Sequence, residues 1–308
     1  MLTKLSNKRA FKQVLAKLIA PGNFFRFLRL LRTTNRYRRA YDDAQLKLYS
    51  QLLPGDFLHY GYFDDPAIVP EKISLHDLQR AQVRYAELIM QKTVDKDLPV
   101  LDVGCGMGGL INLLLQNGFL PVGLTPDRFQ IQYLKEKYPN ISLIHSKFEK
   151  MDVESYKNYF GTVITSESLQ YLNLDEAIST IRQVMTSAGR WIAADYFRVG
   201  DAFEKSGHNW ELFERKLREG GFKIISQQDI TPNVLPTLSY AYMWGERLVV
   251  PLFEFLTGKL QKKQPAIFFL LEEIIEALEV SMADHINVVD PQIFAQGKKY
   301  MLLVIEKS

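Results

Sequence analysis

The sequence of 308 residues contains a single cysteine, Cys105, which excludes an internal disulfide framework and a cysteine-rich metal site. No uninterrupted apolar run approaches the roughly 18 residues needed to cross a bilayer, so no transmembrane helix is expected. The basic N-terminus lacks the apolar core followed by small residues that marks a secretory signal. The five histidines show no metal-ligand spacing, so no metal site is expected. These absences favour a cytoplasmic protein.

Acidic side chains are missing from residues 1–41, which carry eleven Lys and Arg; the remaining chain has 27 basic and 35 acidic residues. Apolar residues recur in this arm at helical spacing, and Pro21 and Gly22 divide it into two short helices. A basic amphipathic segment of this kind is typical of peripheral contact with an anionic membrane or another anionic partner. The alternative is a helical arm that packs on the body while its charges face water.

Strand and helix signals alternate from about residue 97, which predicts βαβ units and a mostly parallel sheet. The expected strands are residues 100–103, 121–124, 141–144, 162–165, 189–195 and 222–227, with a last strand at 300–306. The clearest helical patterns are residues 110–116, 129–137, 175–185 and 266–280. We expect a basic helical extension (1–55), an α/β core (56–231), a helical cap (232–297) and the last strand of the core (298–308).

The most informative segment is VLDVGCGMGG, residues 100–109, in which an apolar strand enters a glycine-rich turn before a helix. Glycines let a backbone approach a ligand closely, and a following helix N-terminus directs free N–H groups at the same place. The G-x-G-x-x-G spacing is weak evidence by itself and also occurs in dinucleotide-binding enzymes. Asp102, two residues before the first glycine, suits a cationic amino group or a bound water and not a pyrophosphate.

The segment LDVGCGMG, residues 101–108, resembles the first motif of class I S-adenosylmethionine-dependent methyltransferases. The resemblance covers residues 56–231 and 298–307 and implies a Rossmann-like sheet of seven strands, with six parallel strands and a last antiparallel one. It also implies that S-adenosyl-L-methionine is the cofactor. The cofactor-binding residues that it implies in this loop are Asp102, Gly104, Cys105 and Gly106.

A narrower resemblance is to the branch that contains cyclopropane-fatty-acid synthases and the sterol and tocopherol methyltransferases. Residues 125–130, TPDRFQ, are similar to the branch signature T-x-S-x-x-Q, with Asp127 where Ser is common. The resemblance implies that Thr125, Pro126 and Gln130 hold the nucleoside. Residues 145–149, HSKFE, align with the segment beside the adenine, which adds Ser146, Lys147 and Phe148 to the cofactor-binding set.

The catalytic candidates come from two further segments of the same branch. Residues 165–172, TSESLQYL, resemble its Glu-Ser segment, which implies that Glu167 faces the reacting centre as a base or a stabiliser of positive charge. A contact to the cofactor or a helix cap is the alternative for Glu167. Tyr171 follows at the predicted pocket, as a catalytic residue or as an aromatic wall.

Residues 57–64, FLHYGYFD, resemble the aromatic segment that closes over the methionine end of the cofactor in this branch. His59 is a catalytic candidate and Tyr60 a cofactor-binding one, with core packing as the alternative for both. Cyclopropane synthases carry a cysteine in this segment, and its absence here argues against cyclopropanation.

The aromatic and aliphatic residues of the predicted cap could line an apolar acceptor pocket, bury ordinary core or form a dimer face. The resemblance and the cap together favour methylation of a small, largely apolar acceptor that is lipid, terpenoid or polyketide-like. Methylation of carbon is slightly favoured over oxygen or nitrogen. Three other functions stay open: a nucleic-acid methyltransferase, which an acidic body disfavours; a nicotinamide-dependent oxidoreductase; and a non-catalytic partner protein of the same fold. No nucleic-acid partner is expected, and the oligomeric state is open.

Overall fold

The computed structural model describes residues 22, 25, 26, 29, 55–200 and 206–308. The chain divides into two compact units, residues 1–52 and 53–308, and the second unit holds every strand described below. The predicted helices of residues 1–41 lie outside the described residues, apart from the four isolated helical positions named first. Among the described helices, none combines the length and the apolar character that a membrane-crossing helix needs.

One sheet organises the second unit, in the order β3-β2-β1-β4-β5-β8-β7. Five strands run parallel from one edge, and β7 shares their direction because the last strand, β8, lies antiparallel between β5 and β7. A two-residue strand, β6 (His208–Asn209), also pairs with β5. The main strands are β1 (Pro99–Val103), β2 (Leu120–Thr125), β3 (Ser142–His145), β4 (Phe160–Ser166), β5 (Met185–Arg198), β7 (Phe222–Asp229) and β8 (Lys298–Lys307). The expected Rossmann-like sheet is confirmed, and its strand order reverses between β1 and β4, where such sheets bind ligands.

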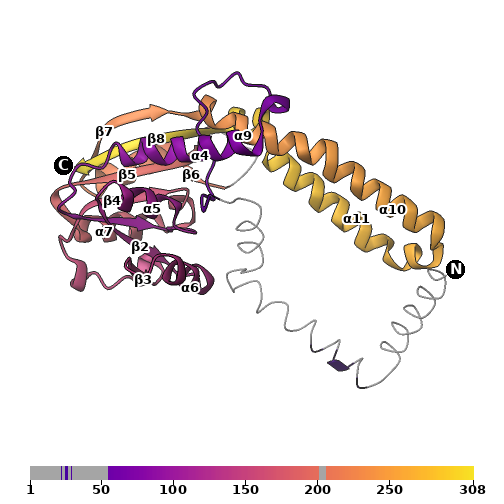
Figure 1. Ribbon diagram of the computed structural model, residues 1–308, viewed down its shortest axis with the longest axis horizontal. Coiled ribbons are helices and arrows are strands. Elements are labelled where there is room, and N and C mark those ends of the chain that lie inside the picture. Colours follow the sequence, from indigo (N-terminus) through magenta and orange to yellow (C-terminus); the bar gives the residue numbers. More distant parts are fainter. Residues whose placement is uncertain (1–21, 23–24, 27–28, 30–54, 201–205) are drawn as a thin grey trace. The chain divides into compact units, whose positions relative to one another are not determined.

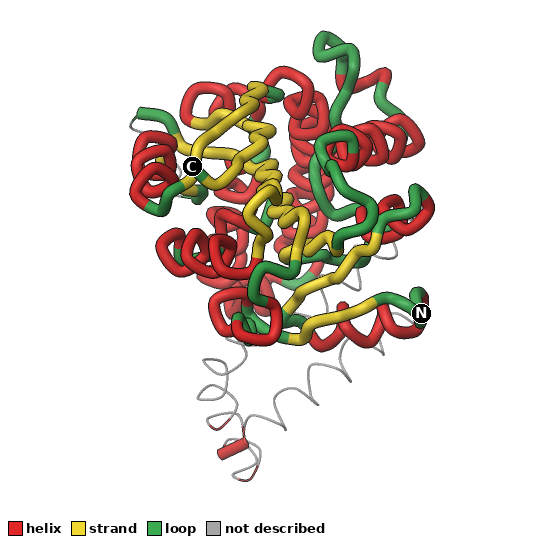
Figure 2. Tube along the Cα trace, turned by 90° about the vertical axis from the view of Figure 1, so that its left-hand side faces the viewer, coloured by secondary structure: helices red, strands yellow, loops and turns green. Residues whose placement is uncertain are grey.

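Helices cover both faces of the sheet (Figures 1 and 2), which explains why its strands are apolar on both sides. A larger core cluster joins strand residues such as Leu101 and Trp191 to α7 and α8, and a second one joins Val100 and Ile192 to Tyr85 on α4. The covering helices are α4 (Leu75–Met90), α5 (Gly109–Gln116), α6 (Arg128–Lys137), α7 (Leu174–Val184) and α8 (Trp210–Glu219).

The stretch between β7 and β8 is helical, as the sequence predicts. It consists of α9 (Thr231–Trp244), the π-helical turn η5 (Gly245–Val249), α10 (Val250–Lys263), α11 (Pro265–Val288) and α12 (Pro291–Gly297). Pro265 begins α11, where a residue without an N–H is tolerated, and Gln264 alone separates α10 from α11. Helices α9 and α12 bury apolar side chains, whereas no residue of α10 or α11 is buried.

Candidate active site

The glycine loop joins β1 to α5 at the carboxyl edge of the sheet. Gly104, Gly106 and Gly108 have φ values of +77°, +56° and +88°, a region that favours glycine. A Cβ atom on Gly104 would lie 2.7 Å from the Cβ atom of Ser168, so neighbouring protein fills that space. A Cβ atom on Gly106 would meet nothing nearer than Leu58 Cδ1 at 3.6 Å. The loop therefore leaves room beside Gly106, where a ligand can approach the backbone.

Asp102 is buried in β1, with 3% of its surface exposed, and its carboxylate accepts no hydrogen bond within the described part of the chain. Burial raises the pKa of Asp102 to about 7, because no donor or cation offsets the loss of solvation. A buried carboxylate becomes favourable when a cationic group reaches it. The position next to the glycine loop therefore fits the ammonium group of an amino-acid moiety.

The end of β2 and the start of α6 form a second polar group. Thr125 Oγ1 donates to Gln130 Oε1, and the Asp127 N–H donates to Thr125 Oγ1 at 3.2 Å. Asp127 Oδ1 caps α6 by accepting from the Gln130 N–H at 2.9 Å. Asp127 Oδ2 is buried and accepts no hydrogen bond from the residues that the structure describes, so it is an acceptor that sugar hydroxyl groups would satisfy. The structure thus adds Asp127 to the side chains that the sequence singled out here.

Four other residues that the sequence assigns to the cofactor differ in burial: Cys105 and Phe148 are buried, Ser146 is half-buried and Lys147 is exposed. Cys105 is buried against Ile111 and Leu134, and Phe148 is part of the main core. Ser146 Oγ donates to the Lys147 carbonyl at 2.8 Å, and Lys147 is exposed. The Cys105 and Phe148 side chains therefore pack in the apolar core, and their role at the cofactor stays a prediction.

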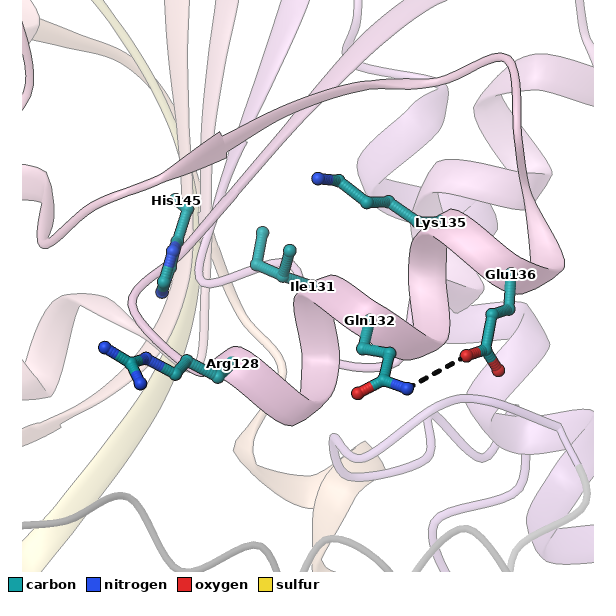
Figure 3. Close-up of a pocket in the computed structure, with 6 residues that line it drawn as sticks. All are labelled: Arg128, Ile131, Gln132, Lys135, Glu136 and His145. Carbon is teal, nitrogen blue, oxygen red and sulfur yellow. Dashed lines mark hydrogen bonds between the residues drawn. The ribbon is translucent and has the colours of Figure 1, made fainter.

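A cavity of about 420 Å³ lies beside this region (Figure 3), lined by Arg128, Ile131, Gln132, Lys135, Glu136 and His145. Its side chains come from α6 and from the end of β3, and Gln132 Nε2 donates to Glu136 Oε1 at 3.1 Å. None of the lining residues is among the sequence-predicted site residues. The buried polar groups, and not this cavity, mark the place for chemistry.

Glu167 follows β4 with a φ of +49°, a backbone conformation that non-glycine residues rarely adopt. Its Oε1 atom accepts from the Tyr60 N–H at 2.8 Å and from the Tyr300 hydroxyl at 2.7 Å. Its Oε2 atom accepts no hydrogen bond from the described residues. Burial raises the pKa of Glu167 to about 7, although both hydrogen bonds oppose the rise. Oε1 of Glu167 is thus held by two hydrogen bonds, and Oε2 accepts none from the described residues.

Two further buried side chains, Tyr85 and Asp195, lie close enough to Glu167 to feel its charge. The hydroxyl groups of Tyr85 and Tyr300 are 2.8 Å apart, and Tyr85 also contacts Ser166 Oγ at 3.2 Å. Asp195 accepts from the N–H groups of Gln170 (3.1 Å) and Tyr196 (2.9 Å). Burial, aided by the charge of Glu167, raises the pKa of Asp195 to about 8.

Sequence reasoning did not find Tyr85, Asp195 or Tyr300. Asp195 and Tyr300 are polar residues within largely apolar strands, whereas Tyr85 lies in the amphipathic helix α4, so the three share no sequence signal. The hydrogen-bond partners of the Tyr85 and Tyr300 hydroxyl groups are 81 to 215 positions away in the chain, so no local motif indicates them.

The Tyr60 N–H contacts Glu167, and the neighbouring His59 ring packs 4.3 Å from the Tyr85 ring, whereas Tyr171 lies on the surface. His59 Nδ1 pairs with the Tyr60 carbonyl at 2.8 Å, and burial lowers the pKa of His59 to about 4, so the imidazole is neutral at pH 7. His59 Nε2 is buried and has no hydrogen-bond partner in the described part of the chain. The Tyr60 ring lies 5.9 Å from the Tyr300 ring. The short turn η4 (Leu169–Tyr171) leaves Tyr171 80% exposed, so the structure places it on the surface and not in a pocket wall.

Comparisons with known proteins identify the family of this chain. The sequence profile of the family described as "Methyltransferase domain" matches residues 100–189, from β1 into β5. An uncharacterized methyltransferase of Bacillus thuringiensis is 30% identical over 154 residues, which are 47% of this chain and 71% of that protein. The chain belongs to the class I S-adenosylmethionine-dependent methyltransferases. S-adenosyl-L-methionine is the cofactor of this methyltransferase, and the partnerless Asp102 and Asp127 oxygens fit its ammonium and ribose groups.

Two other relatives match this chain over different lengths. An O-methyltransferase of Penicillium expansum is 26% identical over 261 residues, which cover 77% of the methyltransferase and 87% of the relative. An uncharacterized methyltransferase of Alkaliphilus oremlandii is 25% identical over 128 residues, 41% of the present chain and 56% of its own length.

Solved structures share the fold. Geranyl diphosphate C-methyltransferase from Streptomyces coelicolor A3(2) has a TM-score of 0.59 and 15% identity, with 81% of the methyltransferase and 91% of that chain covered. A cyclopropane synthase of Mycobacterium tuberculosis has a TM-score of 0.59 and 13% identity, with 84% and 93% covered.

Proposed function

We propose that this methyltransferase transfers a methyl group to a small, largely apolar acceptor, with a nucleophilic carbon as the preferred acceptor atom. One observation carries the proposal: Glu167 has one oxygen fixed by Tyr60 and Tyr300, a free second oxygen and a pKa raised to about 7. A group whose pKa lies near the working pH is well matched to proton transfer.

Bound S-adenosyl-L-methionine supplies an electrophilic methyl carbon. A neutral alkene or enol acceptor would carry one positive charge after it received this methyl group on carbon. The acceptor must then lose a proton to become neutral. The Oε2 atom of Glu167 is placed to receive that proton, while the hydrogen bonds to Oε1 hold the carboxylate in one orientation. Neutral His59, with its unpaired Nε2, offers no competing positive charge.

Aromatic packing around Glu167 supports an apolar acceptor. The Tyr60 ring lies 6.3 Å from Phe294, and Tyr196 lies 5.7 Å from Phe294 and 6.5 Å from Tyr300. Removing apolar ligand surface from water contributes about 25 cal/mol per Å², so a hydrocarbon acceptor gains most from such walls. An isoprenoid-type acceptor is consistent with one structural neighbour, a C-methyltransferase of geranyl diphosphate.

Oxygen methylation is the second candidate, and Lys298 favours it. This lysine is 4% exposed, and its Nζ atom lies 4.4 Å from the centroid of the Tyr196 ring and donates to Ser206 Oγ at 2.8 Å. A buried cation beside the aromatic walls would stabilise a phenolate or enolate oxygen. The named O-methyltransferase relative agrees with this alternative.

The test uses cofactor with a deuterated methyl group, incubated with the full chain and a lipid-soluble cell extract. Mass spectrometry should find an apolar compound that gains one labelled methyl group, and carbon NMR should show that group on carbon. A labelled methyl on oxygen would replace the first candidate with the second. Tight binding of S-adenosylhomocysteine without any labelled product across extracts would contradict the enzyme proposal and favour a non-catalytic partner.

A further inference from the structure

Residues 56–60 form a strap that crosses the carboxyl edge of the sheet without helix or strand conformation. At its first end, the Gly109 N–H at the start of α5 donates to the Asp56 carbonyl at 3.3 Å. In its middle, Leu58 Cδ1 lies 3.6 Å from the point where a Cβ atom of Gly106 would stand. Leu58 therefore borders the room beside Gly106, and the strap passes across the glycine loop.

The second end of the strap is bound to the core. The Tyr60 N–H donates to Glu167 Oε1 at 2.8 Å, and Gln82 Nε2 of α4 donates to the His59 carbonyl at 2.8 Å. The same amide reaches the Phe57 carbonyl at the longer distance of 3.3 Å. These hydrogen bonds hold the strap more firmly near Tyr60 than toward its first end.

The Asp56 side chain attaches the first end of the strap to α6. Its Oδ1 atom accepts from the Tyr133 hydroxyl at 2.6 Å, and its Oδ2 atom accepts from the Tyr138 hydroxyl at 3.1 Å and from Lys137 Nζ. The Asp56 side chain is 12% exposed, so water and salt screen these contacts only in part. Hydrogen bonds to an ionised carboxylate are roughly twice as strong as neutral ones. We call Asp56 and its three donors the Asp56 anchor.

The backbone at Asp56 indicates that the Asp56 anchor constrains the strap. Its φ is +59°, in a region that residues other than glycine adopt uncommonly. Such a conformation persists where the surrounding contacts over-determine it. The helix that supplies the donors has Gln130, which the sequence assigns to the cofactor, in its first turn. The Asp56 anchor therefore joins the strap to an element of the proposed cofactor site.

We propose that Asp56 is a positioning residue that holds the strap closed over the cofactor, and that the Asp56 anchor breaks each time the cofactor enters or its product leaves. A segment that contacts both the glycine loop and Glu167 lies in the path of a ligand bound between them, and closing segments of this kind often limit binding and release.

The Asp56 anchor acts on rates and not on affinity. Its three donors belong to α6 and not to the ligand, so its strength is the same in the free and the loaded protein. Weakening it speeds entry and exit by the same factor. The proposal goes beyond methyl transfer, because it rests on the place of the cofactor at the glycine loop and does not depend on the acceptor.

The test is rapid-mixing kinetics of labelled S-adenosylhomocysteine with the full chain, which measures association and dissociation separately. Asp56→Asn keeps the size of the side chain and a residue type that tolerates positive φ, but it removes the charge that the three donors share. Both rate constants should rise about tenfold, because hydrogen bonds to a charged group are among the strong ones. Their ratio, the dissociation constant, should stay close to that of the wild type.

Three variants of α6 test the Asp56 anchor from its other side. Lys137→Met should raise both rate constants by a smaller factor, and Lys137→Arg, which keeps a cation, should restore them. Lys135→Met is the matched control and should leave both rates unchanged. It removes the same charge from the same helix, at a residue that is not among the described donors to Asp56.

Hydrogen exchange separates opening of the strap from a general loss of structure. In Asp56→Asn, the amides of residues 56–60 should exchange faster, while those of residues 110–116 in α5 should exchange as in the wild type. Faster exchange in both segments would overturn the proposal, because the variant would then have loosened the core.

Two kinetic results would also overturn it. Unchanged rates in Asp56→Asn and Lys137→Met would show that the strap does not limit entry or exit. A rise of the dissociation rate alone, with a matching loss of affinity, would make Asp56 a support of the bound cofactor. Gly106→Val tells the two failures apart: if it still binds, the cofactor placement and the proposal both fail, and if it does not bind while Asp56→Asn keeps wild-type rates, only the proposal fails.

Discussion

The hydroxyl group of Tyr300 donates to Oε1 of Glu167 at 2.7 Å, which ties the last strand of the sheet to the turn after β4. The Tyr85 hydroxyl lies 2.8 Å from the Tyr300 hydroxyl. The Tyr60 N–H also donates to Oε1 of Glu167. These contacts leave Oε2 of Glu167 as its one unbonded oxygen within the described ranges. Tyr300 is thus a positioning residue for the proposed base.

Replacing Tyr300 by Phe should shift the pH dependence of turnover. The hydrogen bond from Tyr300 lowers the pKa of Glu167, so its loss should raise that pKa further above 7. A hydrogen bond to a charged group contributes about 1.5–3 kcal/mol, which corresponds to a shift of about one to two pH units in the rising limb of kcat/KM. Tyr85→Phe is the control, because it leaves the Tyr300–Glu167 hydrogen bond in place. A rising limb that stays where it was would refute the positioning role.

Glu167→Gln should separate chemistry from cofactor binding. The amide keeps the size of the side chain but cannot accept a proton, so turnover should fall about 10²–10⁴-fold, the range for lost acid–base catalysis. Affinity for S-adenosylhomocysteine, measured by calorimetry, should stay within a few-fold of the wild type. A parallel loss of affinity and turnover would make Glu167 a cofactor ligand, and unchanged turnover would remove it from the chemistry.

Gly106→Val should abolish cofactor binding. A side chain at this position meets no protein atom within 3.6 Å, so it would project into the space that a ligand needs. Gly118 is a matched control: its φ is +79° and nothing lies within 4 Å of an added Cβ atom. Gly118→Val should carry a similar backbone strain of about 1–2 kcal/mol and still bind S-adenosylhomocysteine. Calorimetry and thermal melts measure both effects, and equal binding by the two variants would contradict this placement of the cofactor.

The ligand-free methyltransferase should lose stability as the pH rises from 6 to 8. The pKa values of Asp102 and Glu167 are raised to about 7, and that of Asp195 to about 8. An acid whose pKa is raised in the folded state holds its proton more tightly there than in the unfolded state. Its contribution to the free energy of unfolding is therefore complete below the unfolded-state pKa near 4 and is lost as the pH rises through the folded-state pKa. The slope is at most about 1.4 kcal/mol per pH unit for each group.

Thermal melts at pH 6, 7 and 8 measure this slope. Asp102→Asn should flatten it, since the amide has no proton to lose. Saturating S-adenosylhomocysteine should also flatten it in the wild type, because its ammonium group would stabilise ionised Asp102. A melting temperature that rises between pH 6 and 8 would show that the three carboxyl groups are ionised at lower pH than the structure indicates.

Residues 1–41 should bring the full chain to anionic vesicles. Each Lys or Arg near an anionic surface contributes about 1 kcal/mol at most, and the attraction falls with salt. The prediction compares the full chain with one that starts at Tyr41, in co-sedimentation with vesicles of increasing anionic content. The shorter chain is acidic overall and should stay in the supernatant. Equal sedimentation of the two chains would remove the membrane proposal.

Contiguous sequence determined the fold of this methyltransferase and brought together the residues proposed to bind its cofactor. A strand, a glycine turn and a helix N-terminus are neighbours in the chain, so residues 100–109 carry both the βα unit and its ligand-binding geometry. The same holds for residues 125–130, where the side chains that bond one another are at most five positions apart. Local patterns of this kind also located the strands and helices of the sheet to within a few residues, except at β5, which begins four residues earlier than predicted.

Only the tertiary structure decided how the reacting centre is held. Tyr300 and Tyr85 reach Glu167 because β8 inserts between β5 and β7 and α4 packs on the sheet, and no spacing along the chain records either event. The same limit applies to the hairpin of α10 and α11. Periodicity tells which residues share a side of a helix, but whether that side is covered depends on what folds against it. Here the described residues leave large apolar side chains of α10 and α11 exposed, among them Leu252, Ile274 and Leu278.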